Sequence, residues 1–164
     1  MVVSGEFSGA VVLLSPSFAV EDESKFLPML DRLSSVLGHL PYVLMLKMTA
    51  PMMRRSLPEQ RRDALLAELK KNDARTVRRL MHGYVEYLRG RGSLAQPLCD
   101  SGVQAWVAFG EHDEVNLADA EREVLERCPT VSLVTIAGAG HLTHNQKPAE
   151  VAELVLAAVA ATRM

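Results

Sequence analysis

The sequence predicts an α/β fold, built on a short parallel sheet of about three strands with flanking helices and a helical insertion. Three runs rich in Val, Leu and Ile indicate the strands: "AVVLLS" (10–15), "QAWVAF" (104–109) and "VSLVTI" (131–136). None of these runs alternates polar with apolar residues. Continuous apolar runs suit strands that are covered on both faces, as in parallel sheets flanked by helices.

Helical patterns connect and follow the last two strands. In "LADAEREVLERC", Leu117, Val124, Leu125 and Cys128 share one helical face, and Pro129 ends the pattern. After the third strand, "PAEVAELVLAAVAATRM" begins with Pro148 at a plausible first helical position. The order of strand, helix, strand and helix is a βαβ arrangement, for which a right-handed crossover is strongly favoured.

Residues 22–92, between the first and second strands, are almost entirely helical in pattern. "SLPE" at 56–59 has the form of a capping box, and Val77, Leu80, Met81, Tyr84 and Leu88 follow with helical spacing. Gly90 is the expected end of that helix, and "RGRGSLAQP" (89–97) the expected linker back to the sheet. We therefore expect a core made of residues 1–21 and 93–164, interrupted by a helical insertion at 22–92.

Length, charge and hydropathy limit the classes of function. The chain of 164 residues corresponds to one ordinary domain with a sizeable core, and its net charge is −2. Glu153 interrupts the apolar run near the C-terminus, so we expect no membrane-spanning helix. Glu6 stands where a signal peptide needs a positive charge, which favours a buried strand and a cytoplasmic protein. The two cysteines, Cys99 and Cys128, lack the spacing of a disulfide framework or a zinc site.

Positive charge is concentrated in the insertion. Residues 54–91 hold eleven Lys and Arg against five Asp and Glu, a net charge of +6. Such a segment is either a nucleic-acid surface or a solvated helical face with ion pairs between successive turns. Because aromatic residues are few and no DNA-binding motif is present, we expect the solvated face and no nucleic-acid partner.

The segment "AGAGHLTHNQKP" (137–148) places His141 directly after the third strand, on a turn with Gly138 and Gly140. Asp113, in "WVAFGEHDEV", follows the second strand in the same way. The carboxyl ends of parallel strands meet at one edge of a sheet, where functional groups gather. We therefore expect Asp113 and His141 within hydrogen-bond reach, with the carboxylate fixing the tautomer of the imidazole.

Two other interpretations of these residues stay open. His141 can cap the final helix or satisfy backbone groups of a polar turn. His112 and His144, with Asp113, can be read as metal ligands, but a turn leaves their geometry unspecified and no further ligand is regularly spaced. We expect no metal and no cofactor, and expect His112 and His144 at the rim of the site.

The stretch from "WVAFGEHDEV" to "GAGHLTHNQKPAEVAELV" resembles the C-terminal third of the α/β-hydrolase family. That family has a strand ending in Gly-x-x-Asp and another ending in Gly-x-Gly-His, and Asp113 and His141 match its triad acid and histidine. "VVLLSPSF" resembles the strand before the family's helical cap, so the resemblance implies that residues 22–92 are a cap or lid. It also implies hydrolysis of an ester-like or other acyl substrate.

The nucleophile of that family is missing from the sequence. The family carries it on a Gly-x-Ser-x-Gly elbow ahead of the acid and histidine, and neither the serines nor the cysteines of this chain have that context. Ser15 and Ser17, near the end of the first strand, can face the site, but nothing makes them nucleophiles. We therefore expect a partial hydrolase that is inactive alone, with a Ser, Cys or Asp nucleophile supplied by an absent N-terminal half.

Two non-hydrolytic alternatives remain. In one, the chain is a non-catalytic binding or assembly module that forms a homodimer through the exposed strand edge near residues 10–15. In the other, the basic insertion binds nucleic acid, and added salt would weaken that binding steeply. The second alternative has less support, for the reasons given above.

Overall fold

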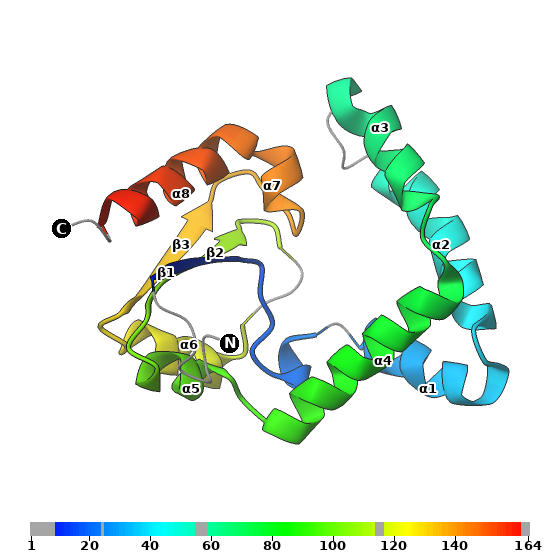
Figure 1. The fold of residues 1–164 in the computed structure, drawn as a ribbon, viewed down its shortest axis with the longest axis horizontal. Helices are drawn as coiled ribbons and strands as arrows, with labels where there is room; N and C mark the ends of the chain where they lie inside the picture. Colours follow the sequence, from blue (N-terminus) through cyan, green and yellow to red (C-terminus); the bar gives the residue numbers. More distant parts are fainter. Residues whose placement is uncertain (1–8, 24, 55–58, 114–116, 162–164) are drawn as a thin grey trace. The chain divides into compact units, whose positions relative to one another are not determined.

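The computed structural model describes residues 9–23, 25–54, 59–113 and 117–161 of the chain (Figure 1). The chain divides into two compact units. We call Met1–Glu23 with Arg91–Met164 the sheet unit, and Ser24–Gly90 the helical unit.

The sheet unit contains three parallel strands in the order β1-β2-β3: β1 (Ala10–Leu14), β2 (Gln104–Gly110) and β3 (Val131–Ile136). Leu14 pairs with Ala108 and Ile136 with Gly110, so all three strands end at the same edge of the sheet. The predicted α/β class and the three predicted strands are confirmed. The strands are those that the continuous apolar runs indicated, because both of their faces are covered.

Helices cover the two faces of the sheet (Figure 1). One face packs against α5 (Ala95–Asp100) and α6 (Asp119–Glu126), and the other against α8 (Pro148–Ala161). Successive residues of β2 point to opposite faces, so Val107 joins the first core and Ala108 the second. The first core holds Phe18, Ala95, Leu98, Ala105, Val107, Leu117 and Leu125; the second holds Ala108, Ile136, Ala139 and Val151.

Asp22 ties the segment after β1 to the rest of the sheet unit. It ends a short 3-10 helix, η2 (Val20–Asp22), and is only 4% exposed. Its Oδ2 accepts hydrogen bonds from the backbone N–H groups of Phe18 (2.7 Å) and Ala19 (3.0 Å). Its Oδ1 accepts one from the N–H of Ala118, just before α6 (2.7 Å). One buried carboxylate thus satisfies three backbone donors from two distant segments.

The described part of the helical unit consists of helices joined by short turns, as its pattern predicts. Its helices are α1 (Phe26–Leu37), α2 (Leu40–Met53), α3 (Glu59–Leu69) and α4 (Ala74–Arg91). Asp73 caps α4, since its Oδ2 accepts a hydrogen bond from the N–H of Thr76 (2.9 Å). The predicted capping box at Ser56 lies outside the described residues.

The predicted linker at 89–97 is wrong in its bounds. The α4 helix continues through Gly90 to Arg91, and α5 already begins at Ala95. Gly92 has a φ of 65°, the left-handed conformation that commonly follows the last turn of a helix. Gly92, and not Gly90, therefore ends the helix, and the connection to the sheet unit is short.

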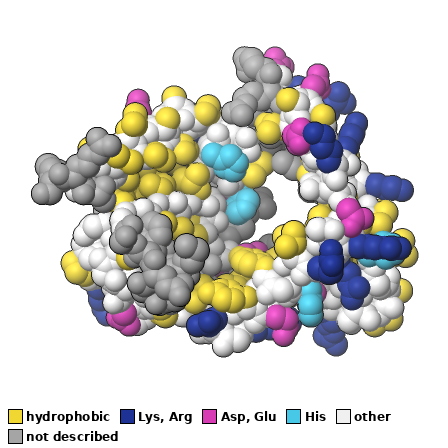
Figure 2. Space-filling model, in the orientation of Figure 1, with side chains coloured by type: hydrophobic (Ala, Val, Ile, Leu, Met, Phe, Trp, Pro, Cys, Tyr) yellow, Lys and Arg dark blue, Asp and Glu magenta, His cyan; other side chains and the backbone are white. Residues whose placement is uncertain are grey.

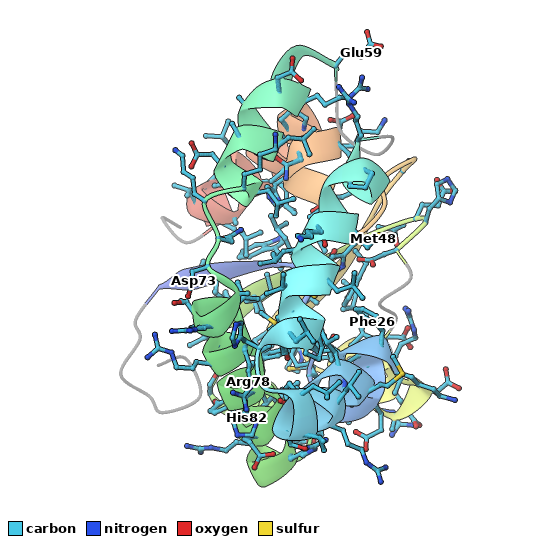
Figure 3. The ribbon with its side chains drawn as sticks, turned by 90° about the vertical axis from the view of Figure 1, so that its right-hand side faces the viewer. Phe26, Met48, Glu59, Asp73, Arg78 and His82 are labelled. Atoms are coloured by element: carbon cyan, nitrogen blue, oxygen red, sulfur yellow. The ribbon has the colours of Figure 1, made fainter. Side chains whose placement is uncertain are left out.

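Polar contacts join α1 to α4 within the helical unit. His82 Nδ1 lies 3.0 Å from Oδ1 of the buried Asp31. One turn away, Arg78 Nε donates to Ser34 Oγ over 3.3 Å. Figure 3 shows Asp73, Arg78 and His82 following one another along α4. Among the described residues, no helix is long and apolar enough to cross a bilayer.

Candidate active site

Asp113 and His141 lie together at the carboxyl edge of the sheet. Asp113 follows β2 by three residues and His141 follows β3 by five. His141 Nδ1 lies 3.1 Å from Asp113 Oδ1 and 3.4 Å from Oδ2. The proximity that the sequence predicts for these two side chains is therefore present, although 28 residues separate them.

Burial differs sharply between the two partners. The Asp113 side chain is 1% exposed, whereas that of His141 is 52% exposed. An ionised carboxylate only accepts hydrogen bonds, so Nδ1 must carry the proton that joins the pair. In the neutral ring this leaves Nε2 without a proton. The arrangement presents a basic nitrogen on an accessible imidazole whose tautomer a buried carboxylate fixes.

Backbone hydrogen bonds hold the two segments together beyond the ends of the strands. Glu111 N–H donates to Ile136 O (3.0 Å), and His112 N–H donates to Ala139 O (2.8 Å). Ala139 is fully buried under this contact. The parallel pairing of β2 and β3 is thus prolonged into the two turns, and it brings Asp113 to the segment that carries His141.

Gly110 permits this close approach. A Cβ atom at this position would lie 2.4 Å from Gly140 O and 2.5 Å from Ala139 O, both of them backbone atoms. Such distances are far below van der Waals contact, and the carbonyls cannot move away as a flexible side chain could. The last residue of β2 must therefore be glycine if the turn bearing His141 is to pack against it.

Side chains from neighbouring segments fix the glycine turn itself. Gly138 has a φ of 64°, and its N–H donates to Glu111 Oε2 (2.8 Å). Gly140 N–H donates to Gln146 Oε1 (2.6 Å), from the short helix α7 (Thr143–Gln146). Both donors precede His141, so these two hydrogen bonds hold the backbone that leads into it.

Ser15 is the first residue after β1, at the same edge of the sheet. Its backbone has a φ of 48°, and it is the one non-glycine residue of the described chain with a positive φ. Its N–H donates to Ala108 O (2.8 Å), while its buried Oγ has no hydrogen-bond partner among the described residues. A serine in this conformation is strained. This strain could not be predicted from the sequence. Ser17, the other serine near the end of β1, donates to Glu23 Oε1 (2.6 Å).

His112 and His144 do not join the pair of Asp113 and His141. The His112 side chain is 71% exposed, with Nε2 4.0 Å from Glu111 Oε2. His144 is exposed, and its Nε2 lies 3.0 Å from Asn145 Nδ2. Within the part of the chain that the structure describes, no cluster of three or more His, Cys, Asp or Glu side chains is placed to hold a metal ion.

Comparison with solved structures identifies the fold. MenH from S. aureus superposes with a TM-score of 0.71 at 14% identity, over 99% of this chain and 63% of that one. A thermophilic esterase from Thermogutta terrifontis gives 0.62 at 14% identity, over 93% and 56%. MGS-M2, an α/β hydrolase from a Medee basin deep-sea metagenome library, gives 0.55 at 15% identity, over 91% and 55%.

The chain therefore has the fold of part of an α/β-hydrolase, as the sequence resemblance predicts, and it spans 55–63% of the length of these three structures. No protein-family model matches the sequence. No curated protein matches it either.

Proposed function

We propose that the chain supplies the acid and the histidine of a catalytic triad for hydrolysis of an ester-like or other acyl substrate. The hydrogen bond between Asp113 and His141, at the carboxyl edge of a parallel sheet, carries this proposal. The solved structures with this fold include an esterase and several hydrolases, which supports a hydrolytic reaction. They share 14–16% of their residues with this chain, and the proposal accordingly names a class of substrate.

In this reaction His141 Nε2 removes the proton of a nucleophile as it attacks the acyl carbon, and then returns that proton to the leaving group. Asp113 holds the ring in the required tautomer and stabilises the imidazolium that forms between the two transfers. The low exposure of the Asp113 carboxylate strengthens that stabilisation, because little water reaches that side of the pair.

The nucleophile belongs to another segment in this proposal. The sequence contains no Gly-x-Ser-x-Gly elbow, and Ser15, which directly follows β1, is flanked by Leu13 and Ser17 rather than by glycines. We therefore propose that these 164 residues do not hydrolyse esters by themselves. In chain order the helical unit corresponds to the cap that the sequence resemblance implies.

The decisive experiment begins with the DNA upstream of the Met1 codon. If it encodes, in frame, strands and a Gly-x-Ser-x-Gly elbow, the extended chain is expressed and assayed with p-nitrophenyl esters of increasing acyl length. Asp113→Asn should lower kcat by about 10⁴-fold, and His141→Ala should lower it by about 10⁶-fold. His112→Ala, at an exposed position beside Asp113, is the matched control and should stay close to the parent. An extended chain that keeps its activity in His141→Ala would overturn the proposal.

If no elbow is encoded upstream or in a neighbouring gene, the alternative is a non-catalytic protein that dimerises. Two observations favour it. β1 pairs with β2 alone among the described residues, which leaves its other edge open. On α8, Val155 and Leu156 are 41% and 69% exposed, and hydrophobic side chains gather over this helix (Figure 2). An open strand edge beside an apolar helix face favours pairing with a second chain.

Sedimentation equilibrium tests this alternative directly. A homodimer in the wild type would support it if each of two variants is a monomer. Leu156→Lys places a charge in the apolar face of α8, and Val12→Pro disrupts the edge of β1. A wild-type monomer at high micromolar concentration would exclude it.

A further inference from the structure

Cys99 and Cys128 lie side by side in the sheet unit, although nothing in their spacing suggests it. Cys99 is on α5, and Cys128 follows the end of α6. The two side chains line the same cavity, and Cys99 Sγ donates to Val124 O on α6 over 3.9 Å. Neither cysteine is in a disulfide in this structure. The packing of α5 against α6 thus creates a pair of thiols from two separate segments.

Polar groups around Cys128 stabilise its thiolate. Its Sγ lies 3.4 Å from Thr130 Oγ1. Burial acts to raise the pKa of the Cys128 thiol, but the polar groups of Cys99 and Thr130 beside the sulfur outweigh burial and lower that pKa. Burial and the neighbouring Cys128 raise the pKa of Cys99 to about 12. One thiol is therefore prepared as the nucleophile while the other stays protonated.

The two sulfurs share a cavity of 330 Å³. Besides Cys99 and Cys128, it is lined by Gln96, Asp100, Val124, Arg127 and Pro129. Cys128 is 7% exposed at the residue level and Cys99 is half-buried, so the cavity is the route by which a reagent reaches them. A volume of this size lies at the small end of ligand sites.

We propose that Cys99 and Cys128 form a redox site that reacts reversibly with small-molecule disulfides. The Cys128 thiolate attacks one sulfur of the disulfide, so that a bond forms between Cys128 and that sulfur while the other leaves as a thiolate and takes up a proton. Cys99 then loses its proton to solvent and attacks Cys128 Sγ, which releases the second small thiol. Two protein thiols are oxidised to one disulfide, and the small disulfide is reduced to two thiols.

The order of the two attacks follows from the charges. Once Cys128 carries the mixed disulfide, its sulfur has no negative charge. The repulsion from that charge is one of the causes that raise the pKa of Cys99, so its loss favours deprotonation of Cys99. Resolution by Cys99 then follows in the contact that already exists. This site is separate from Asp113 and His141, because Cys99 and Cys128 precede β2 and β3 whereas the other pair follows them.

The test uses the full chain, fully reduced and then treated with glutathione disulfide, with intact mass measured over time. The wild type should lose the mass of two hydrogens. Peptide mapping should join the segments that contain Cys99 and Cys128. Cys99→Ser keeps a hydroxyl donor toward Cys128 and should stop at one glutathionyl adduct. Cys128→Ser should react at least about tenfold more slowly than Cys99→Ser, because only the protonated thiol remains.

Thr130→Val provides a milder variant with both thiols intact, and it should slow the first step without preventing closure. Circular dichroism checks that each variant is folded. If a variant is unfolded, peptide maps of the wild type at early times still show which sulfur is glutathionylated first. Glutathione on Cys99 before Cys128, equal rates in the two serine variants, or a wild type that never loses two hydrogens would each overturn the proposal.

Discussion

Gly110, the last residue of β2, lies so close to Gly140 that a Cβ atom on the first would be 2.4 Å from the carbonyl oxygen of the second. This contact sets the height of the turn that carries His141 above the end of β2, where Asp113 follows. The position of the His141 imidazole thus depends on Gly110 having no side chain, as well as on the contact of the ring with Asp113.

Gly110→Ala should destabilise the protein by roughly 1–3 kcal/mol and separate His141 from Asp113. The added Cβ would clash with Ala139 O, which accepts the hydrogen bond of His112 N–H, and with the neighbouring backbone oxygen of Gly140. Urea unfolding measures the loss. Gly83→Ala is the control: it lies within α4 with nothing near its missing Cβ, and it should stabilise by about 0.5–1 kcal/mol. An equal, favourable effect at both glycines would contradict the close approach.

The tautomer of His141 gives a test that needs no enzymatic activity. Long-range ¹H–¹⁵N NMR spectra, recorded where the imidazole is neutral, should show the proton on Nδ1 in the wild type. In Asp113→Asn the side-chain amide can donate to Nδ1, which should move the population toward protonated Nε2. The exposed His112 ring serves as the internal reference and should keep its wild-type pattern. A wild type already protonated on Nε2 would rule out the proposed role of Asp113.

Asp22→Ala should be among the more destabilising changes in the sheet unit. It removes the acceptor of three backbone N–H groups, two of which are in the segment after β1 and one before α6. Hydrogen bonds to a charged group contribute about 1.5–3 kcal/mol each, and partial rehydration should leave a total loss of roughly 3–5 kcal/mol. Glu21→Ala, at the exposed neighbouring position, should change the free energy of unfolding by less than about 0.5 kcal/mol.

Acid should remove the contribution of the α4 cap. Hydrogen bonds from the backbone N–H and then the hydroxyl of Thr76 lower the pKa of Asp73 from its usual 3.8. Because the pKa of Asp73 is lower in the folded protein than in the unfolded chain, its carboxylate stabilises the folded state fully at any pH above the pKa of the unfolded chain. This stabilisation is lost as the pH falls through the pKa of the folded protein. The melting temperature of Asp73→Ala should therefore lie below that of the wild type at pH 7, and the difference should shrink below pH 3.8.

Thermal melts at several pH values measure that difference, and Asp63→Ala on α3 is the comparison, since Asp63 is an exposed carboxylate within a helix. A gap between wild type and Asp73→Ala that stays constant into strong acid would show that the cap does not act through its charge.

The parts of the structure that follow from local pattern could be predicted from the sequence. Continuous apolar runs gave β1, β2 and β3, and the residues just after β2 and β3 indicated Asp113 and His141. In a parallel sheet the ends of neighbouring strands must meet, so sequence position alone places those two side chains together.

Features that depend on contacts between distant segments could not be predicted. Gly110 looks like any glycine at the end of a strand, because the carbonyls that require it belong to another turn. The sequence pattern predicts that the helix ends at Gly90, whereas α4 continues to Arg91 and the positive φ of Gly92 marks its end. The pair of Cys99 and Cys128 was hidden because the short helix α5, which brings Cys99 to α6, was not recognised in the sequence.

The polarity of β2 and β3 has a practical consequence for anyone who studies this protein. Each strand has a thiol before its first residue and a member of the acid–histidine pair after its last. β2 has seven residues, and at roughly 3.3 Å per residue this places the two groups ~20 Å apart. A fluorophore or spin label attached to Cys128, the more reactive of the two thiols, would thus report on the motions of the sheet from its amino end and leave the surface around His141 open to the ligand being tested.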